Sequence, residues 1–168
     1  QMFFPEALTY EDMYWRPLLD IYAKGIYLID EKLYHYFENP CSTVLSLNAD
    51  HHMDWITVQM KKWADYHKRR IWEEYQEELE FGLLVSAVGF LKLLVLRYEK
   101  PSFSLFQLEK NVIQHYVPDY RKNKYVSSIT EIEIQNIFLN MLYSDQNKKE
   151  FQDMVEKIKN SQNTDIKM

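Results

Sequence analysis

The chain has 168 residues and a mass of 20.5 kDa, enough for one well-covered hydrophobic core and short for two domains. Hydrophobic residues make up 46% of it and charged residues 27%, which excludes global disorder. Its formal net charge of -5 argues against a protein whose whole surface binds nucleic acid.

Turn-forming residues and cysteine are scarce, with 3 glycines, 5 prolines and the single Cys41. Sheet proteins of this size need many tight turns, so the scarcity favours long helices with few connections. One cysteine excludes an internal disulfide and a multi-cysteine metal site, and it favours a reducing, cytoplasmic compartment. Glycine-rich phosphate loops and serine nucleophile elbows need closely spaced glycines, and the sequence contains neither motif.

The first long helix is expected to begin near Pro17, because proline suits a first helical position. Apolar side chains then recur at steps of three or four residues, which predicts a single helical stripe that Asn39 and Pro40 end. The tyrosines of this stretch exceed what one stripe buries, which favours a partner surface or self-association. The stripe consists of Leu18, Tyr22, Ile26, Ile29, Leu33 and Phe37.

Residues 40–49 form an irregular connection, in which residues 42–47 (STVLSL) have no obvious partner strand. The next helix starts after Asn48 or Asp50. If it ran unbroken to residue 98 it would be about 75 Å long, too long for a compact domain of this size. We expect a break at Phe81–Gly82, because glycine is a poor helix former, or alternatively around residues 67–70.

Residues 81–98, FGLLVSAVGFLKLLVLRY, form the most apolar stretch, which must be covered on every side. Gly82, Ser86 and Gly89 share one narrow stripe that would let a neighbouring helix approach closely. The stretch has the minimum length of a membrane span, but Lys92 inside it and its charged flanks favour a buried core helix.

Further helices follow Pro101, and residues 161–168 are expected to form a disordered tail because they have nothing to bury. The sequence therefore predicts an all-α, single-domain bundle of about six helices over residues 1–160, arranged around the central helix 81–98. The expected N-terminal caps of the later helices are Ser104 with Gln107, Ser128 with Glu131, and Ser144 or Asp145.

One cluster, His51, His52, Asp54 and His67, has the residue types of a metal-dependent phosphohydrolase of the HD type. On a helix, however, His52 and Asp54 lie about 200° apart, and His67 is about four turns beyond His52. The spacing favours helix-start and surface histidines over a metal site, so no metal or other cofactor is expected.

A second cluster combines basic and aromatic residues, a pattern that follows a phosphate backbone and stacks bases. The acidic residues that follow in the sequence partly neutralise this charge, so a solvated helix face is the alternative interpretation. These residues are Glu73, Glu74, Glu77, Glu78 and Glu80. The candidate contacts to nucleic acid or an acidic partner are Lys61, Lys62, Trp63, Tyr66, Lys68, Arg69 and Arg70, with the later group Arg121, Lys122 and Lys124.

The sequence thus favours a soluble, non-catalytic interaction or regulatory module that acts through protein–protein contacts with a partner or as a homodimer, and not on a membrane. A nucleic-acid-binding regulator using the basic–aromatic residues is the alternative. A metal-dependent hydrolase is a third hypothesis.

Overall fold

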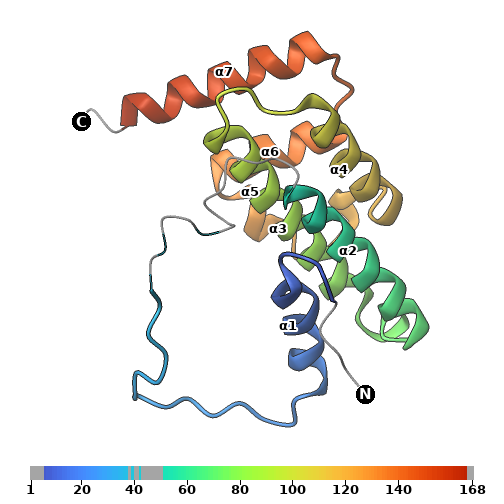
Figure 1. Cartoon of the computed structure of the whole chain (residues 1–168). Coiled ribbons are helices and arrows are strands. Elements are labelled where there is room, and N and C mark those ends of the chain that lie inside the picture. Colours follow the sequence, from blue (N-terminus) through green and yellow to red (C-terminus); the bar gives the residue numbers. More distant parts are fainter. Residues whose placement is uncertain (1–5, 38, 40–41, 43–50, 166–168) are drawn as a thin grey trace. The chain divides into compact units, whose positions relative to one another are not determined.

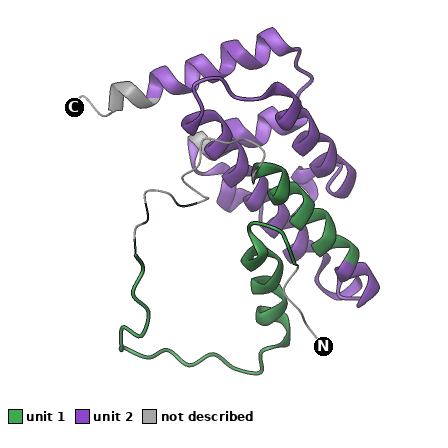
Figure 2. Cartoon of the chain, viewed as in Figure 1, with its two compact units in different colours: residues 1–64 green, residues 65–168 purple. Residues whose placement is uncertain are grey.

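The computed structural model describes residues 6–37, 39, 42 and 51–165, with the backbone alone at residues 51, 134 and 162–165. The described residues contain helices and no strand, and the all-α bundle that the sequence predicts is confirmed. The chain divides into two compact units, residues 1–64 and residues 65–168 (Figure 2). That residues 1–160 form one domain stays a prediction.

In the first unit, helix α1 (Glu11–Tyr22) begins well before Pro17, which lies inside it, so the predicted start is wrong. After α1, Ala23 is extended, and residues 24–37 form no helix (Figure 1). The predicted helix to Phe37 is therefore also wrong. A helix gains most of its stability by packing its apolar face, and every residue from 23 to 37 is exposed.

Helix α2 (His51–Lys68) contains the end of the first unit and the start of the second. In the first unit, the Tyr10 hydroxyl lies 3.0 Å from Nδ1 of His52. The backbone N–H of Thr9 donates to Oδ2 of Asp54 at 3.0 Å, and the Tyr10 ring meets Trp55 edge to face at 5.1 Å. These contacts attach the turn before α1 to the first turns of α2. The predicted caps Asn48 and Asp50, Cys41 and most of residues 42–47 lie outside the described residues.

The chain breaks between α2 and α3 (Trp72–Arg97) at Arg70, which adopts a left-handed φ of 57°. The N–H of Ile71 donates to the Tyr66 carbonyl at 3.0 Å, and the N–H of Arg70 donates to the His67 carbonyl at 3.1 Å. This pair of bonds is a Schellman motif, which satisfies the last carbonyls of a helix. The second predicted break is thus confirmed and the first is wrong, since Gly82 lies inside α3.

Helix α3 is the central element of the second unit, where it contacts α4 (Phe103–Tyr116), α6 (Glu133–Tyr143) and α7 (Lys148–Asp165). Its inner side buries a continuous apolar surface, so the predicted core helix is present. The sequence predicts that this helix is covered on every side, but its outer side is exposed. The buried residues are Leu79, Leu83, Leu84, Ala87, Val88, Phe90, Leu91, Leu94 and Val95.

Aromatic and polar contacts join the elements around α3. Phe106 of α4 stacks on Phe151 of α7, with ring centroids 4.7 Å apart. Lys110 of α4 donates to the Ser144 carbonyl at 2.7 Å. Lys159 of α7 donates to the carbonyls of Tyr98 and Glu99, which follow the end of α3, so a cation meets the negative end of that helix dipole.

The short elements η2 (Tyr120–Lys122) and α5 (Ser127–Thr130) connect α4 to α6. Asn123, directly after η2, donates through its side chain to the Glu77 carbonyl of α3 at 2.7 Å. Tyr143 of α6 donates to the Val117 carbonyl at 2.6 Å, and burial raises the pKa of its phenol well above the usual range. These contacts hold the connection against the helices.

The helices are capped by other residues than those that the sequence predicts. Ser102, not Ser104, caps α4 by accepting from the Leu105 N–H at 3.2 Å. Asn147, not Ser144 or Asp145, caps α7, accepting from the Lys149 and Glu150 N–H groups. Ser128 lies inside α5 instead of capping a helix with Glu131. Helix α7 extends through Asp165, into the predicted tail, and residues 166–168 lie outside the described residues.

Candidate protein-interaction surfaces

Among the described residues of the first unit, the most exposed apolar surface is residues 23–37, which we call the apolar segment. Tyr27 and Leu28 are each 94% exposed, and Phe37 is 91% exposed. Soluble proteins seldom leave so many large apolar side chains together in water, and such surfaces mark interaction sites. The other large apolar residues exposed in this segment are Ile26, Ile29, Leu33, Tyr34 and Tyr36.

The apolar segment keeps the sequence pattern of a helix although it is not helical here. At 100° per residue, Ile26, Ile29, Leu33 and Phe37 fall within about 80° of one another. Tyr27 and Leu28 would lie off this stripe, on the opposite half of the helix. A segment that folds into a helix only when a partner covers its apolar stripe would have both this helical spacing and a non-helical free form.

The second unit exposes the outer face of α3, which comprises Gly82, Val85, Gly89, Lys92, Leu93 and Leu96. Val85 is 46% exposed, and Leu93 and Leu96 are half-buried. A Cβ built at Gly82 or Gly89 meets nothing within 4 Å among the described atoms. The expectation that a neighbouring helix of the same chain packs closely on this small-residue stripe is therefore wrong for the described residues.

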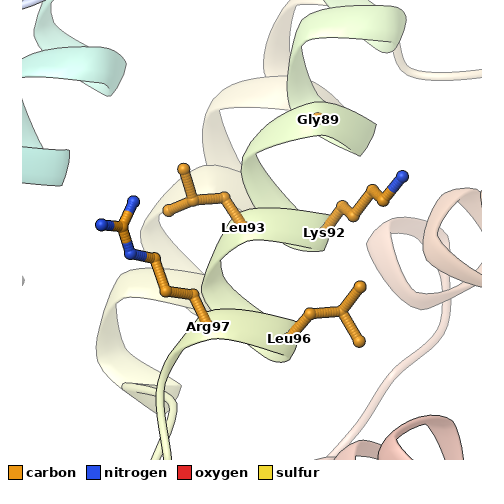
Figure 3. A pocket seen from close by; sticks show the side chains of 5 residues that line it. All are labelled: Gly89, Lys92, Leu93, Leu96 and Arg97. Atoms are coloured by element: carbon orange, nitrogen blue, oxygen red, sulfur yellow. The ribbon is translucent and has the colours of Figure 1, made fainter. Parts of the chain in front are cut away.

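A shallow hollow of about 430 Å³ follows the carboxyl-terminal half of this outer face. Figure 3 shows Lys92 and Leu96 leaving one side of α3 and Leu93 and Arg97 leaving the other, with Gly89 one turn away. The hollow thus has an apolar floor flanked by two cations. That arrangement suits an apolar helix carrying acidic residues.

Helix α3 is also long and apolar enough to cross a membrane, and half of its most apolar window is buried inside the chain. A core helix has the same length and composition as a span. The burial of Leu84, Phe90 and Leu91 against the other helices of the second unit matches a core helix.

The predicted basic–aromatic cluster lies on α2 and the turn after it. Lys61, Lys68 and Arg70 are exposed, and Nε of Arg69 contacts Oδ2 of Asp65 at 2.5 Å. Base stacking requires exposed aromatic rings, but Trp63 and Tyr66 are buried. Lys62 is also buried, and its desolvation lowers its pKa to about 8.

The second basic group lies on η2 and the residue after Asn123, and carboxylates accompany each of its cations. Arg121 and Lys122 lie 4.0 and 3.9 Å from Asp119, and Lys124 lies 3.3 Å from Glu78. The hydrogen bond from the Tyr125 hydroxyl, together with Lys124, holds the pKa of Glu78 below its usual range. The local charge available to a phosphate backbone is therefore small.

The histidine cluster is used structurally where the structure describes it. His52 is buried beside Tyr10, and Asp54 accepts the Thr9 N–H, so both side chains hold the turn before α1. His67 is exposed beside the Trp72 ring. Among the described residues, no group of three or more His, Cys, Asp and Glu side chains is placed to hold a metal ion.

One buried ionisable group has no counterpart in the sequence predictions. Glu109 of α4 is fully buried, and neither carboxylate oxygen has a hydrogen-bond partner in the described residues. Desolvation raises its pKa to about 8. Its position does fall on the apolar stripe of α4, four residues after Leu105 and three before Val112, but a carboxylate there gives no signal of burial.

Comparison with protein-family models, with curated proteins and with solved structures returns no match for this chain. Its function is therefore inferred from its own surfaces.

Proposed function

We propose that this protein is a non-catalytic interaction module that binds a partner protein through the apolar segment, residues 23–37. The observation that carries the proposal is the exposure of that segment's large apolar side chains. Burying one such side chain contributes about 1.5–3 kcal/mol, so a partner that covers several of them gains a substantial driving force.

The bound form is an amphipathic helix that lays Ile26, Ile29, Leu33 and Phe37 into an apolar groove of the partner. Their helical spacing supports this mode over an added strand, which would alternate apolar and polar residues. Part of the binding energy is spent on ordering the segment, so we expect moderate affinity with a large gain in helix content.

The nucleic-acid alternative has less support. Trp63 and Tyr66 are buried, and the exposed cations of residues 121–124 lie beside carboxylates. The hydrolase hypothesis has no described metal-holding group in its favour.

The test compares two double variants of the full chain. Ile29→Ser with Leu33→Ser removes the centre of the stripe, whereas Tyr27→Ser with Leu28→Ser removes exposed apolar surface off the stripe. Proteins captured by the unaltered chain and by the off-stripe variant, but lost with the stripe variant, are then purified. They are titrated with a synthetic peptide of residues 20–39, and helix content is followed by circular dichroism.

We expect peptide binding with a gain of helix, and at least about tenfold weaker binding for the stripe variant, a loss of about 1.4 kcal/mol. Equal capture by both variants, or binding without added helix, contradicts the proposal. DNA or RNA binding that weakens steeply with salt, unchanged in both variants, would replace it with the regulator hypothesis.

A further inference from the structure

Helix α1 exposes two large apolar side chains at its carboxyl-terminal end, directly before the apolar segment. Leu19 is 47% exposed and Tyr22 is 46% exposed, whereas Leu18 is fully buried. The chain continues from them into residues 23–37 of the same unit (Figure 1), and residues 18–39 contain no proline. The two exposed residues are therefore candidates for the surface that binds the partner.

Leu19 and Tyr22 are in helical register with the stripe of the apolar segment. If α1 continued past Tyr22 at 100° per residue, Leu19 would point in the direction of Phe37, and Tyr22 would lie within about 20° of Leu33. One continuous helix would therefore present a single apolar face, about 80° wide, from α1 to the end of the segment. This face consists of Leu19, Tyr22, Ile26, Ile29, Leu33 and Phe37.

The backbone at the end of α1 is close to the conformation that extension requires. Ala23 has a helical φ of -68°, and only its ψ of 127° is extended. Its N–H already donates to the Leu19 carbonyl at 2.8 Å, the i to i−4 bond of an α-helix. Ala23 does not adopt the left-handed conformation with which Schellman and αL motifs terminate a helix. Rotation of one backbone angle therefore lets the next residue continue α1.

A preformed helix end reduces the cost of folding the apolar segment. A separate helix over residues 26–37 would have to fix its own first turn, for which the nucleation constant is about 10⁻³. Helix α1 supplies that turn, so each further residue only propagates it. Gly25 opposes propagation, but a glycine lowers the equilibrium constant for helix formation only about fourfold, far less than nucleation does. Extension of α1 is thus the easier route to the bound helix.

We propose that α1 is the folded beginning of the binding helix. The partner extends α1 without interruption to Phe37, and it buries Leu19 and Tyr22 together with the stripe. The apolar face from Leu19 to Phe37 is about 27 Å long, against about 17 Å from Ile26 to Phe37, so the partner offers a long apolar groove. This inference rests on the proposed function, to which it adds two binding residues and the size of the groove.

The test replaces Gly25, at the junction between α1 and the apolar segment, by proline and by alanine in the full chain. A Cβ there meets nothing within 4 Å among the described atoms, so both substitutions are compatible with the free fold. Inside a continuous helix, proline clashes with the Ile21 carbonyl and removes a hydrogen bond. At the start of a separate helix, proline is favourable. The probe is the protein that the unaltered chain captures and the stripe variant does not, and calorimetric titration measures its affinity for each variant.

We expect Gly25→Pro to weaken partner binding at least about tenfold and Gly25→Ala to strengthen it about fourfold. Unchanged or tighter binding of Gly25→Pro overturns the inference, because it shows a separate helix. Weaker binding of both variants also overturns it, because the junction then has to stay flexible. In either case the proposed function stands as long as Ile29→Ser with Leu33→Ser loses binding. If that stripe variant binds as well as the unaltered chain, the proposed function itself is wrong, and this inference falls with it.

A second pair of double variants tests the two α1 residues. Leu19→Ser with Tyr22→Ser removes them from the apolar face, whereas Arg16→Ser with Asp20→Ser changes exposed residues on another side of α1. We expect at least about tenfold weaker binding for the first double variant and little change for the second, and thermal unfolding checks that both are folded. Equal binding by the two double variants would show that the partner does not contact α1, which contradicts the inference.

Trifluoroethanol, which induces helix without a partner, gives an independent measurement on the full chain. Backbone chemical shifts show where new helix forms. We expect helical shifts to advance from Ala23 towards Phe37 as trifluoroethanol is added, and Gly25→Pro to stop this advance at α1. Helix that appears first at residues 29–33, separated from α1 by extended residues, overturns the inference and leaves the proposed function in place.

Discussion

Individual residues show where the fold stores unfavourable energy. Glu109 is fully buried with no partner for its carboxylate oxygens in the described residues, and Arg70 occupies a left-handed backbone conformation that suits glycine. Each such position costs about 1–3 kcal/mol, a substantial fraction of a net stability of about 5–15 kcal/mol. Substitution of either residue should therefore change the free energy of unfolding measurably.

At the residue scale, we predict that Glu109→Gln removes a pH dependence of stability. The folded pKa of about 8 lies above the unfolded value of 4.5, so the folded state binds more protons between these values. Stability is fully present below about pH 4.5 and falls with rising pH by about 1.4 kcal/mol per unit until about pH 8.

Glutamine resembles the protonated glutamate in shape and charge. We therefore expect Glu109→Gln to equal the unaltered chain at pH 4.5 and to exceed it by about 3 kcal/mol at pH 7 in urea unfolding. Glu156→Gln, at an exposed position of α7, is the control. Parallel stability–pH curves for Glu109→Gln and the unaltered chain would show that Glu109 ionises normally in the folded state.

Helices in this protein end where local backbone bonds and packing allow it, and glycine is not required. The α2–α3 break uses the left-handed conformation of Arg70 and the bond from Ile71 to the Tyr66 carbonyl. Tyr66 and Ile71 are both buried, which supplies the apolar contact that accompanies a Schellman motif. The non-helical residue inside α3 is Tyr75, whereas Gly82 and Gly89 lie in the helical part that follows it.

At the element scale, we predict that Arg70→Gly stabilises the protein by about 1 kcal/mol, because glycine adopts the left-handed conformation without the Cβ clash. The matched control Lys68→Gly, in the last turn of α2, should destabilise by up to about 1 kcal/mol. Chemical denaturation measures both. A loss of stability in Arg70→Gly would mean that the arginine side chain contributes more than its backbone strain removes.

On the scale of the whole molecule, the described part of the chain combines a helical core with a long exposed stretch. The helices around α3 bury a continuous apolar surface, whereas residues 23–37 expose theirs. The free energy of local unfolding rises with burial and with backbone hydrogen bonding. The two regions should therefore differ widely in how well their amides are protected from hydrogen exchange.

We accordingly predict that hydrogen exchange of the free chain is fast in residues 23–37 and slowest in the buried part of α3, residues 83–95. Mass spectrometry of peptic peptides measures both regions at once. Addition of a partner should slow exchange in residues 26–37 as the helix forms. Protection of this segment in the free, monomeric chain would contradict its exposed conformation.

The scarcity of turn-forming residues and the helical spacing of apolar residues determined the all-α class, and the most apolar run determined the position of the core helix. These follow from side chains near each other in the chain, as in the apolar run from Phe81 to Tyr98, whose burial on one side is confirmed. The same pattern predicted a helix through Phe37, which is wrong for the described chain because a stripe is helical only when something covers it.

Only the tertiary structure decided which side of α3 is exposed, and that Tyr66 and the carboxylate of Glu109 are buried. Local spacing places a residue on one face of a helix, but it does not encode which distant helices pack against that face. For the same reason the outer face of α3 was visible in the sequence as a small-residue stripe, while its lack of a covering helix within the described residues became evident only from the packed helices.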